Sequence, residues 1–112
     1  MMQGELVWVR FPYSDLQQEK IRPTLVVSNT EYNRKSPDVV VCAVTSNLEP
    51  RPYSIALPQD QVTDGKLPLP SRIRADKIMQ VSQSMVLKAF CRVKPAVFDS
   101  TLREIQRLTK RE

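Results

Sequence analysis

Two apolar runs of this chain end in residues that are suited to chemistry. Arg22 stands just before the run at residues 24–28, and the run at residues 39–44 is followed by Thr45-Ser46-Asn47. If these runs are neighbouring strands, a permanent cation meets hydroxyls and an amide at the edge of a dry core. Such a set suits a phosphate group, because a guanidinium offers a fork of donors that matches phosphate oxygens.

A second polar cluster lies further along the chain. Arg72, Arg74 and Asp76 alternate with Ile73 and Ala75. Side chains of a strand point alternately to its two faces, so the three charged residues share one face, with next neighbours about 7 Å apart. The cluster is either functional or an exposed face held by salt bridges that contribute little to stability. Taken singly, Arg22 and Thr45 have equally ordinary readings, as a surface arginine and a hydroxyl at a strand end.

Length and charge limit the class of protein. The chain has 112 residues, which predicts a single domain over residues 1–112 with a core of its own. Its 17 Lys and Arg residues exceed its 12 Asp and Glu residues, for a net charge of +5. A basic surplus favours polyanionic partners such as nucleic acid, although a surplus that serves only solubility gives the same number.

The chain has no histidine, which excludes histidine triads, imidazole zinc sites and paired-histidine ribonuclease mechanisms. We expect no metal and no cofactor. Cys42 and Cys91 lie in apolar segments without a CxxC spacing, as buried thiols in a reducing cytosol do. No apolar stretch approaches about 18 residues, so we expect a cytoplasmic protein without a signal peptide or membrane span.

The hydrophobic pattern is mainly that of strands. Short runs rich in β-branched residues predict strands over residues 6–11, 24–28, 39–44, 53–57, 71–79 and 88–93. The second and third runs are continuously apolar, as in strands covered on both faces. Residues 29–38 predict a loop or a single helical turn, and residues 59–70 a surface loop. A C-terminal helix is predicted from the spacing of its apolar residues, which are Phe98, Leu102, Ile105 and Leu108. Together these elements predict a strongly curled antiparallel sheet capped by one helix.

The order of these elements and the residues at their ends resemble the MazF/PemK family of toxins, over residues 4 to about 108. Four groups of residues carry the resemblance, and they occur in the order and at the spacing of that family. They are Gly4-Glu5-Leu6-Val7-Trp8-Val9 with Phe11-Pro12, Arg22-Pro23 with Leu25-Val26-Val27-Ser28-Asn29, Ala43-Val44-Thr45-Ser46-Asn47, and Arg74-Ala75-Asp76-Lys77-Ile78.

The resemblance implies a mainly β fold with a C-terminal helix, an SH3-like barrel of the MazF/PemK/CcdB type, and a homodimer. It implies the toxin of a type II toxin-antitoxin system, a ribonuclease that cuts single-stranded RNA, usually mRNA, at short motifs without a metal ion. A cognate antitoxin would inhibit it. The positions that match the family's catalytic pair are Arg22 and Thr45. Residues expected to bind RNA or assist catalysis are Glu19, Lys20, Ser46, Arg74 and Asp76.

Metal-free RNA cleavage requires two proton transfers and the stabilisation of negative charge. The 2′-hydroxyl must lose a proton as it attacks phosphorus, the leaving 5′-oxygen must gain one, and charge on the phosphoryl oxygens must be stabilised. Arg22 suits the last task, and Pro23 restricts its backbone to extended conformations. Thr45 would donate a hydrogen bond to a phosphoryl oxygen. Because a guanidinium is a poor base, we expect Glu19 or Asp76 to be the base.

Aromatic residues could select the sequence by stacking on RNA bases. The candidates are Trp8, Tyr13 and Tyr53, each of which could equally belong to a core or an interface. Residues 15–21 would form a flap over the RNA.

Two other functions remain open. A toxin of the same fold could inhibit DNA gyrase without being an enzyme, although such an inhibitor has no chemical need for Arg22-Pro23 together with Thr45-Ser46. An inactive dimeric binding module would keep all of these residues.

Overall fold

The computed structural model describes residues 1–12 and 19–112. Its strands are β1 (Glu5–Pro12), β2 (Glu19–Val26), β3 (Asp38–Thr45), β4 (Ser54–Leu57), β5 (Val62–Thr63), β6 (Ser71–Ser82) and β7 (Val86–Val93). The α-helices are α1 (Thr30–Lys35) and α2 (Pro95–Leu108), and the two 3-10 turns are η1 (Gln59–Gln61) and η2 (Gln83–Met85). The expected fold class, mainly β with a C-terminal helix, is confirmed.

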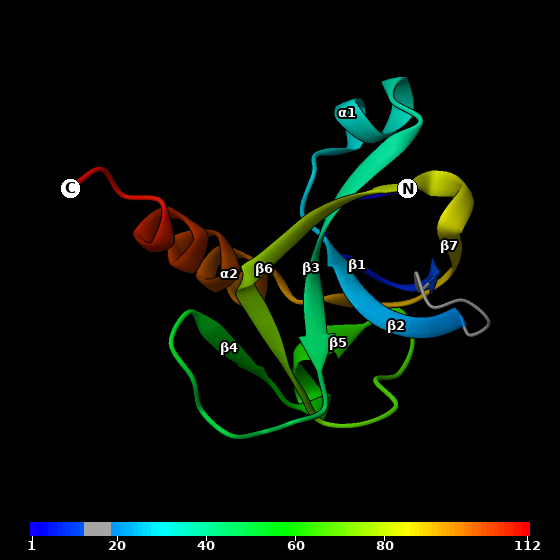
Figure 1. The fold of residues 1–112 in the computed structure, drawn as a ribbon. Coiled ribbons are helices and arrows are strands. Elements are labelled where there is room, and N and C mark those ends of the chain that lie inside the picture. Colours follow the sequence, from blue (N-terminus) through cyan, green and yellow to red (C-terminus); the bar gives the residue numbers. More distant parts are fainter. Residues whose placement is uncertain (13–18) are drawn as a thin grey trace.

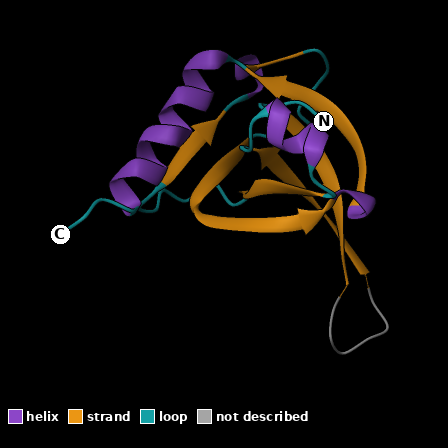
Figure 2. Cartoon of the chain, turned by 90° about the horizontal axis from the view of Figure 1, so that it is seen from above, coloured by secondary structure: helices purple, strands orange, loops and turns teal. Residues whose placement is uncertain are grey.

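The strands form one antiparallel sheet in the order β4-β6-β3-β2-β1-β7-β5. The sheet curls strongly, and the long strand β6 bends across it (Figure 1). Helix α2 lies along one side, where it packs against β4 and β6. Figure 2 shows the outer ends of β1 and β2 extending away from the rest of the sheet.

The three central strands, β1, β2 and β3, bury side chains on both faces, as the continuous apolar runs of β2 and β3 predict. Leu6, Leu25 and Cys42 pack into one core cluster, which also receives residues of β4, β6, β7 and α2. The residues that alternate with them pack into a second cluster, made of Val7, Val9, Val26, Val39 and Val41. The curled sheet therefore encloses apolar side chains on both of its surfaces.

Strand β2 begins at Glu19, well before the apolar run that predicted it. Its outer half pairs in register with β1, from Glu19 opposite Pro12 to Thr24 opposite Val7. The side chains of residues 19–22 are exposed, so this half of the strand has no apolar alternation that a sequence pattern could detect.

The connections also contain more structure than the sequence predicts. Residues 30–35 form helix α1, whose first turn is capped by the Asn29 side chain accepting from the Tyr32 amide at 2.8 Å. The expected loop at residues 59–70 contains η1 and β5, and the strand predicted over 71–79 continues to Ser82.

Helix α2 begins with Pro95 in its first turn and buries a narrow stripe. Val97 and Thr101 are buried, and Phe98 and Ile105 pack against the core. Leu102 and Leu108, which were expected on the same stripe, are more than a third exposed at 37% and 39%. The helix packs mainly against β4 and β6, and Leu102 and Leu108 lie outside this contact. Neither helix of the described residues has the length and apolar run that a membrane crossing requires.

Both cysteines are buried and unpaired, as predicted. Burial raises the pKa of the Cys42 thiol to about 12, with a smaller contribution from the negative charge of Asp76. Burial likewise raises the pKa of the Cys91 thiol to about 11. Because the thiolate is the reactive form, both side chains act as small core hydrophobes rather than nucleophiles.

Candidate active site

The candidate site lies where β2 and β3 stop pairing. The two strands pair only from Val26 opposite Val41 to Thr24 opposite Ala43. The Val27 amide donates to the Val40 carbonyl at 2.9 Å, so the backbone groups of Val27 point toward β3. Every second residue of a strand points its backbone groups to the same neighbour, so Leu25 and then Pro23 also face β3. Pro23 has no N–H to donate, and the ladder ends there.

Beyond this point the strands separate, because each keeps a different neighbour. The outer half of β2 stays paired with β1, whereas the outer half of β3 pairs with β6, with Thr45 opposite Arg72. If the register of Thr24 and Ala43 were continued by two residues, Arg22 would stand opposite Thr45. Arg22 and Thr45 therefore lie just beyond the last paired residues of β2 and β3, and Figure 1 shows these two strands running apart.

A pocket of about 590 Å³ occupies this opening. Its polar side chains are cations and hydroxyls, and they are Arg22, Thr24, Thr45, Ser46, Arg51, Ser71, Arg74 and Lys77. Its larger apolar side chains come from β1, β7 and the segment before β6, and they include Trp8, Phe11, Leu67, Pro68, Leu69 and Phe90. No carboxylate occurs among the described residues that line the pocket. The lining of the pocket therefore combines positive charge with apolar and aromatic side chains.

Thr45 and Arg22 both have donors to offer to a ligand. The Thr45 hydroxyl oxygen accepts from the Asn47 amide at 3.1 Å, which orients the oxygen and leaves its proton for another acceptor. The Arg22 side chain is exposed and makes no hydrogen bond or ion pair with any described residue. Its guanidinium is thus a charged fork of donors beside an oriented hydroxyl.

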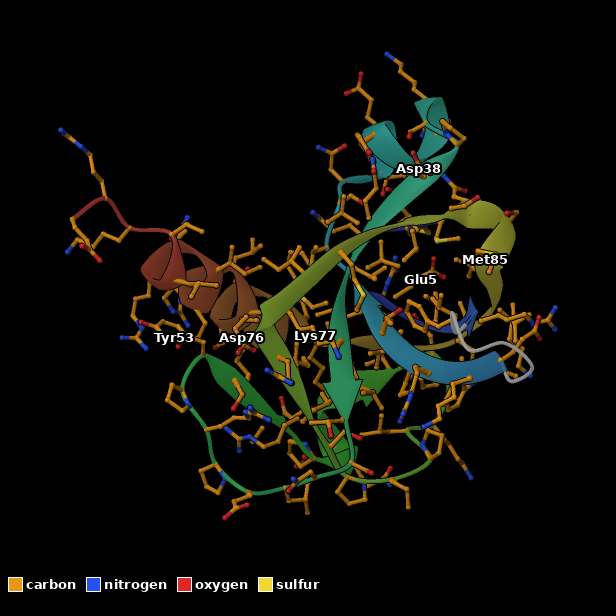
Figure 3. All side chains as sticks on the ribbon, viewed as in Figure 1. Glu5, Asp38, Tyr53, Asp76, Lys77 and Met85 are labelled. Carbon is orange, nitrogen blue, oxygen red and sulfur yellow. The ribbon has the colours of Figure 1, made fainter. Side chains whose placement is uncertain are left out.

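Arg74 and Asp76 form a forked ion pair beside the pocket. Arg74 donates from Nε to Oδ1 at 3.1 Å and from Nη2 to Oδ2 at 3.0 Å. The register of β6 shifts here, since Ala43 pairs with Arg74 while Cys42 pairs with Ile78, so the intervening residues bulge out of the ladder. Arg74 lines the pocket and Asp76 does not. Figure 3 shows Asp76 and Lys77 next to one another on β6.

The hydrogen bonds from Arg74 hold the pKa of Asp76 below its usual range. A carboxylate whose pKa is lower in the folded state stabilises the fold above its unfolded pKa of about 4, and this stabilisation is lost as pH falls through the folded pKa. Asp76→Asn removes the titrating group, so its urea midpoint should fall less between pH 5 and pH 2.5 than that of the parent protein. Asp60→Asn, at an exposed position of η1 outside the ion pair, is the control. Equal acid sensitivity of the parent and Asp76→Asn would contradict this prediction.

The remaining charged candidates lie outside the pocket. Glu19 lies at the outer end of the β1–β2 pair, where its Oε2 is 3.2 Å from Arg10 Nε, and neither Glu19 nor Lys20 lines the pocket. Arg72, which was expected to share a face with Arg74, donates to the hydroxyl and carbonyl oxygens of Ser54 at 3.0 and 3.3 Å. Of the seven expected site residues, the pocket therefore brings together Arg22, Thr45, Ser46 and Arg74.

Of the two aromatic candidates that the structure describes, one lines the pocket. Trp8 lines it and stacks on Phe90, with ring centroids 4.7 Å apart. Tyr53 instead lies under the guanidinium of Arg107, 4.7 Å from the ring centroid. Tyr13 and residues 15–18 of the expected flap lie outside the described residues, and residues 19–21 belong to β2.

The sequence patterns did not single out several residues of the pocket, among them Arg51, Lys77 and Phe90. Arg51 lies in an irregular connection between β3 and β4, and Phe90 reads as one more apolar residue of a strand. Lys77 follows Asp76 directly, so the polar cluster on β6 was a signal that could have found it. Within residues 1–12 and 19–112, no group of three or more His, Cys, Asp or Glu side chains is placed to hold a metal ion.

Solved structures resemble this chain over nearly its whole length. MazE-MazF from Deinococcus radiodurans (Form-III) has a TM-score of 0.83 and 21% identity, and the match covers 100% of this chain and 98% of that chain. An endoribonuclease in complex with its cognate antitoxin, from a mycobacterial species, has a TM-score of 0.80, 21% identity and the same coverage. The Mycobacterium tuberculosis toxin MazF-mt6 has a TM-score of 0.77 and 12% identity, and the match covers 96% of this chain and 98% of that chain. These likenesses confirm the expected barrel of the MazF/PemK type.

No protein of curated function matches the sequence. A family model, however, matches residues 2–109, and it describes PemK-like, MazF-like toxins of type II toxin-antitoxin systems. This span contains every element of the sheet and the whole of α2. The chain belongs to this family of PemK-like, MazF-like toxins.

Proposed function

We propose that this toxin is a metal-independent, sequence-specific endoribonuclease that cleaves single-stranded RNA, with mRNA as its cellular substrate. One observation carries the proposal. The Arg22 side chain has no partner among the described residues and shares a pocket with Thr45. The Thr45 hydroxyl accepts from the Asn47 amide, which leaves its proton for a ligand. Family membership and structural neighbours that are named endoribonucleases support the same activity.

In this mechanism the 2′-oxygen forms a bond to phosphorus while the bond to the 5′-oxygen breaks. Arg22 holds the phosphoryl oxygens and neutralises the charge that develops on them. It gives a proton to the leaving 5′-oxygen, while water takes the proton of the 2′-hydroxyl and returns a proton to Arg22. Thr45 donates a second hydrogen bond to the same phosphate. Donors that are already oriented toward developing charge stabilise a transition state at little reorganisation cost. The products are a 2′,3′-cyclic phosphate and a 5′-hydroxyl end.

The described residues of the pocket supply cations but no carboxylate that could act as the general base. Glu19 and Asp76 both lie outside the pocket, and each is engaged by an arginine. The forked pair lowers the pKa of Asp76, which makes that carboxylate a weaker base. We therefore assign most of the rate enhancement to phosphate binding, with Arg51, Arg74 and Lys77 adding to the positive field around Arg22.

We further propose that the toxin acts in the cytoplasm as a homodimer under the control of a cognate antitoxin. Two neighbours are complexes, one of an endoribonuclease with its cognate antitoxin and one of MazE with MazF. Since this chain carries a net charge of +5, an acidic disordered segment of the antitoxin would compete with RNA for the same surface.

The test uses one single-stranded RNA in the presence of EDTA. The purified toxin should cut the all-ribose strand and leave the same strand with 2′-deoxy substitutions intact, because the 2′-oxygen is the nucleophile. Mass spectrometry of the products should identify the cyclic phosphate and the 5′-hydroxyl end. Equal cutting of the deoxy strand would sink this mechanism. If a varied RNA pool stays intact while expression still arrests growth, the activity is that of a non-enzymatic gyrase inhibitor or a binding module.

Thr45 offers an isosteric test of the hydrogen bond. Thr45→Val keeps the shape of the side chain and removes its hydroxyl, so kcat should fall roughly 10- to 100-fold, as expected for a hydrogen bond to a charged group. Thr45→Ser keeps the hydroxyl and should retain most of the rate. The measurement is single-turnover cleavage of one fluorescent RNA, and equal rates for the valine and serine variants would argue against the assignment.

A further inference from the structure

The apolar lining of the pocket includes a stacked pair of aromatic rings. Trp8 on β1 and Phe90 on β7 stack with centroids 4.7 Å apart and an interplanar angle of 28°. Both residues are half-buried, and neither belongs to the fully buried core. Phe90 packs against the core cluster, and both rings also line the pocket.

Phe90 reaches the pocket because the ladder between β1 and β7 is irregular. Leu6 pairs with Cys91 while the next residue, Val7, pairs with Ala89, so Phe90 has no opposite residue on β1. An extra residue of this kind turns its side chain away from the regular alternation, and such bulges are frequent next to functional sites. Gly65 lies so close to the Phe90 carbonyl group that a Cβ at this position would collide with it.

The pocket thus joins two surfaces of different chemistry. Arg22, Arg74 and Lys77 suit an anion, whereas Trp8 and Phe90 suit a flat apolar ring. Inorganic phosphate would contact only the cationic side chains. A nucleotide carries both an anion and a planar ring, and the volume of about 590 Å³ lies within the range of about 300–1,000 Å³ that small-molecule sites span.

We propose that the Trp8–Phe90 pair is a nucleobase subsite beside the phosphate held by Arg22, so that Phe90 helps to determine which RNA sequence is bound. This inference rests on the proposed ribonuclease function. In consequence the toxin binds free nucleoside 3′-monophosphates, which resemble one end of a cleaved strand, with the base packed against the ring pair.

The ring pair contains its own reporter, because Trp8 is the single tryptophan of the chain. Its fluorescence is recorded while the toxin is titrated with each of the four nucleoside 3′-monophosphates, with ribose 5-phosphate and with inorganic phosphate. A stacked base should quench Trp8 with saturation for at least one nucleotide. Neither of the phosphates that lack a base should do so at the same concentration. If no nucleotide quenches more than ribose 5-phosphate, the inference is wrong.

Variants of Phe90 test the second ring. Phe90→Leu keeps an apolar side chain without the ring and should weaken nucleotide binding roughly 5- to 150-fold, the range that base stacking contributes in single-stranded complexes. Phe90→Tyr keeps the ring and should bind as the parent protein does. Tyr32→Leu, which changes an aromatic residue of α1 outside the pocket, is the matched control. Unchanged affinity of Phe90→Leu would overturn the inference, and the titration of the parent protein decides it independently of how any variant folds.

The outcome is separable from the proposed function, because nucleotide binding is measured without turnover. Quenching by a nucleotide in a toxin that does not cut RNA would support the subsite and reject the ribonuclease. Cleavage of RNA without quenching by any nucleotide would do the reverse.

Discussion

Arg22→Lys is expected to lower kcat for RNA cleavage by roughly 100- to 1,000-fold, the loss seen when one donor to a developing oxyanion is removed. Lysine keeps the positive charge, but it presents a single ammonium where the guanidinium presents a planar fork matched to two phosphoryl oxygens. The long-range attraction of RNA would survive, so KM should change much less than kcat. Single-turnover and steady-state cleavage of one RNA separate these two effects.

Arg34→Lys provides the matched control, since Arg34 is an exposed arginine of α1 that does not line the pocket. This variant should cleave RNA at the parent rate. Full activity of Arg22→Lys would show that charge alone suffices at this position, and the proposed role of the guanidinium fork would have to be abandoned. Loss of activity in both variants would point to a general effect of arginine replacement instead of a role for Arg22.

Gly65→Ala should destabilise the protein more than the same substitution at its other glycine, Gly4. A Cβ at this position would lie 2.0 Å from the Phe90 carbonyl oxygen and 3.0 Å from its carbon, in backbone that cannot yield without moving β7. Gly65 also has a φ of 141°, a conformation that residues with a Cβ rarely adopt. Strain and overpacking together should cost roughly 2–5 kcal/mol, a large part of the usual 5–15 kcal/mol for a domain.

The urea midpoint of Gly65→Ala measures this loss, and Gly4→Ala is the control. Gly4 has a φ of 91°, yet a Cβ there would meet no atom within 4 Å. Gly4→Ala therefore carries the backbone strain without the collision, and it should cost clearly less than Gly65→Ala. Equal destabilisation by both variants would show that strain alone matters and that the contact with Phe90 is unimportant.

Much of the fold follows from local patterns in the sequence. The continuous apolar runs at residues 24–28 and 39–44 require cover on both faces, and the structure buries Leu25 and Val26 in different core clusters. The outer half of β2 was not predictable in this way, because its exposed residues carry no apolar alternation and are ordered by pairing with β1. Pairing across strands depends on long-range geometry that no local pattern contains.

Some residues of the candidate site were predictable from the sequence, whereas others were placed only by the tertiary structure. Polar side chains at the ends of apolar runs are easily recognised in the sequence, and these are Arg22 and Thr45. Pro23 has no N–H to donate, so it ends the ladder between β2 and β3. The tertiary structure alone decided which other residues join them. A shift of register turns Phe90 into the pocket, the bulge of β6 sets Asp76 against Arg74, and Glu19 is left outside beside Arg10. Residue type and order determine which chemistry is available, whereas strand register and divergence determine which side chains meet, because those depend on contacts between segments far apart in the chain.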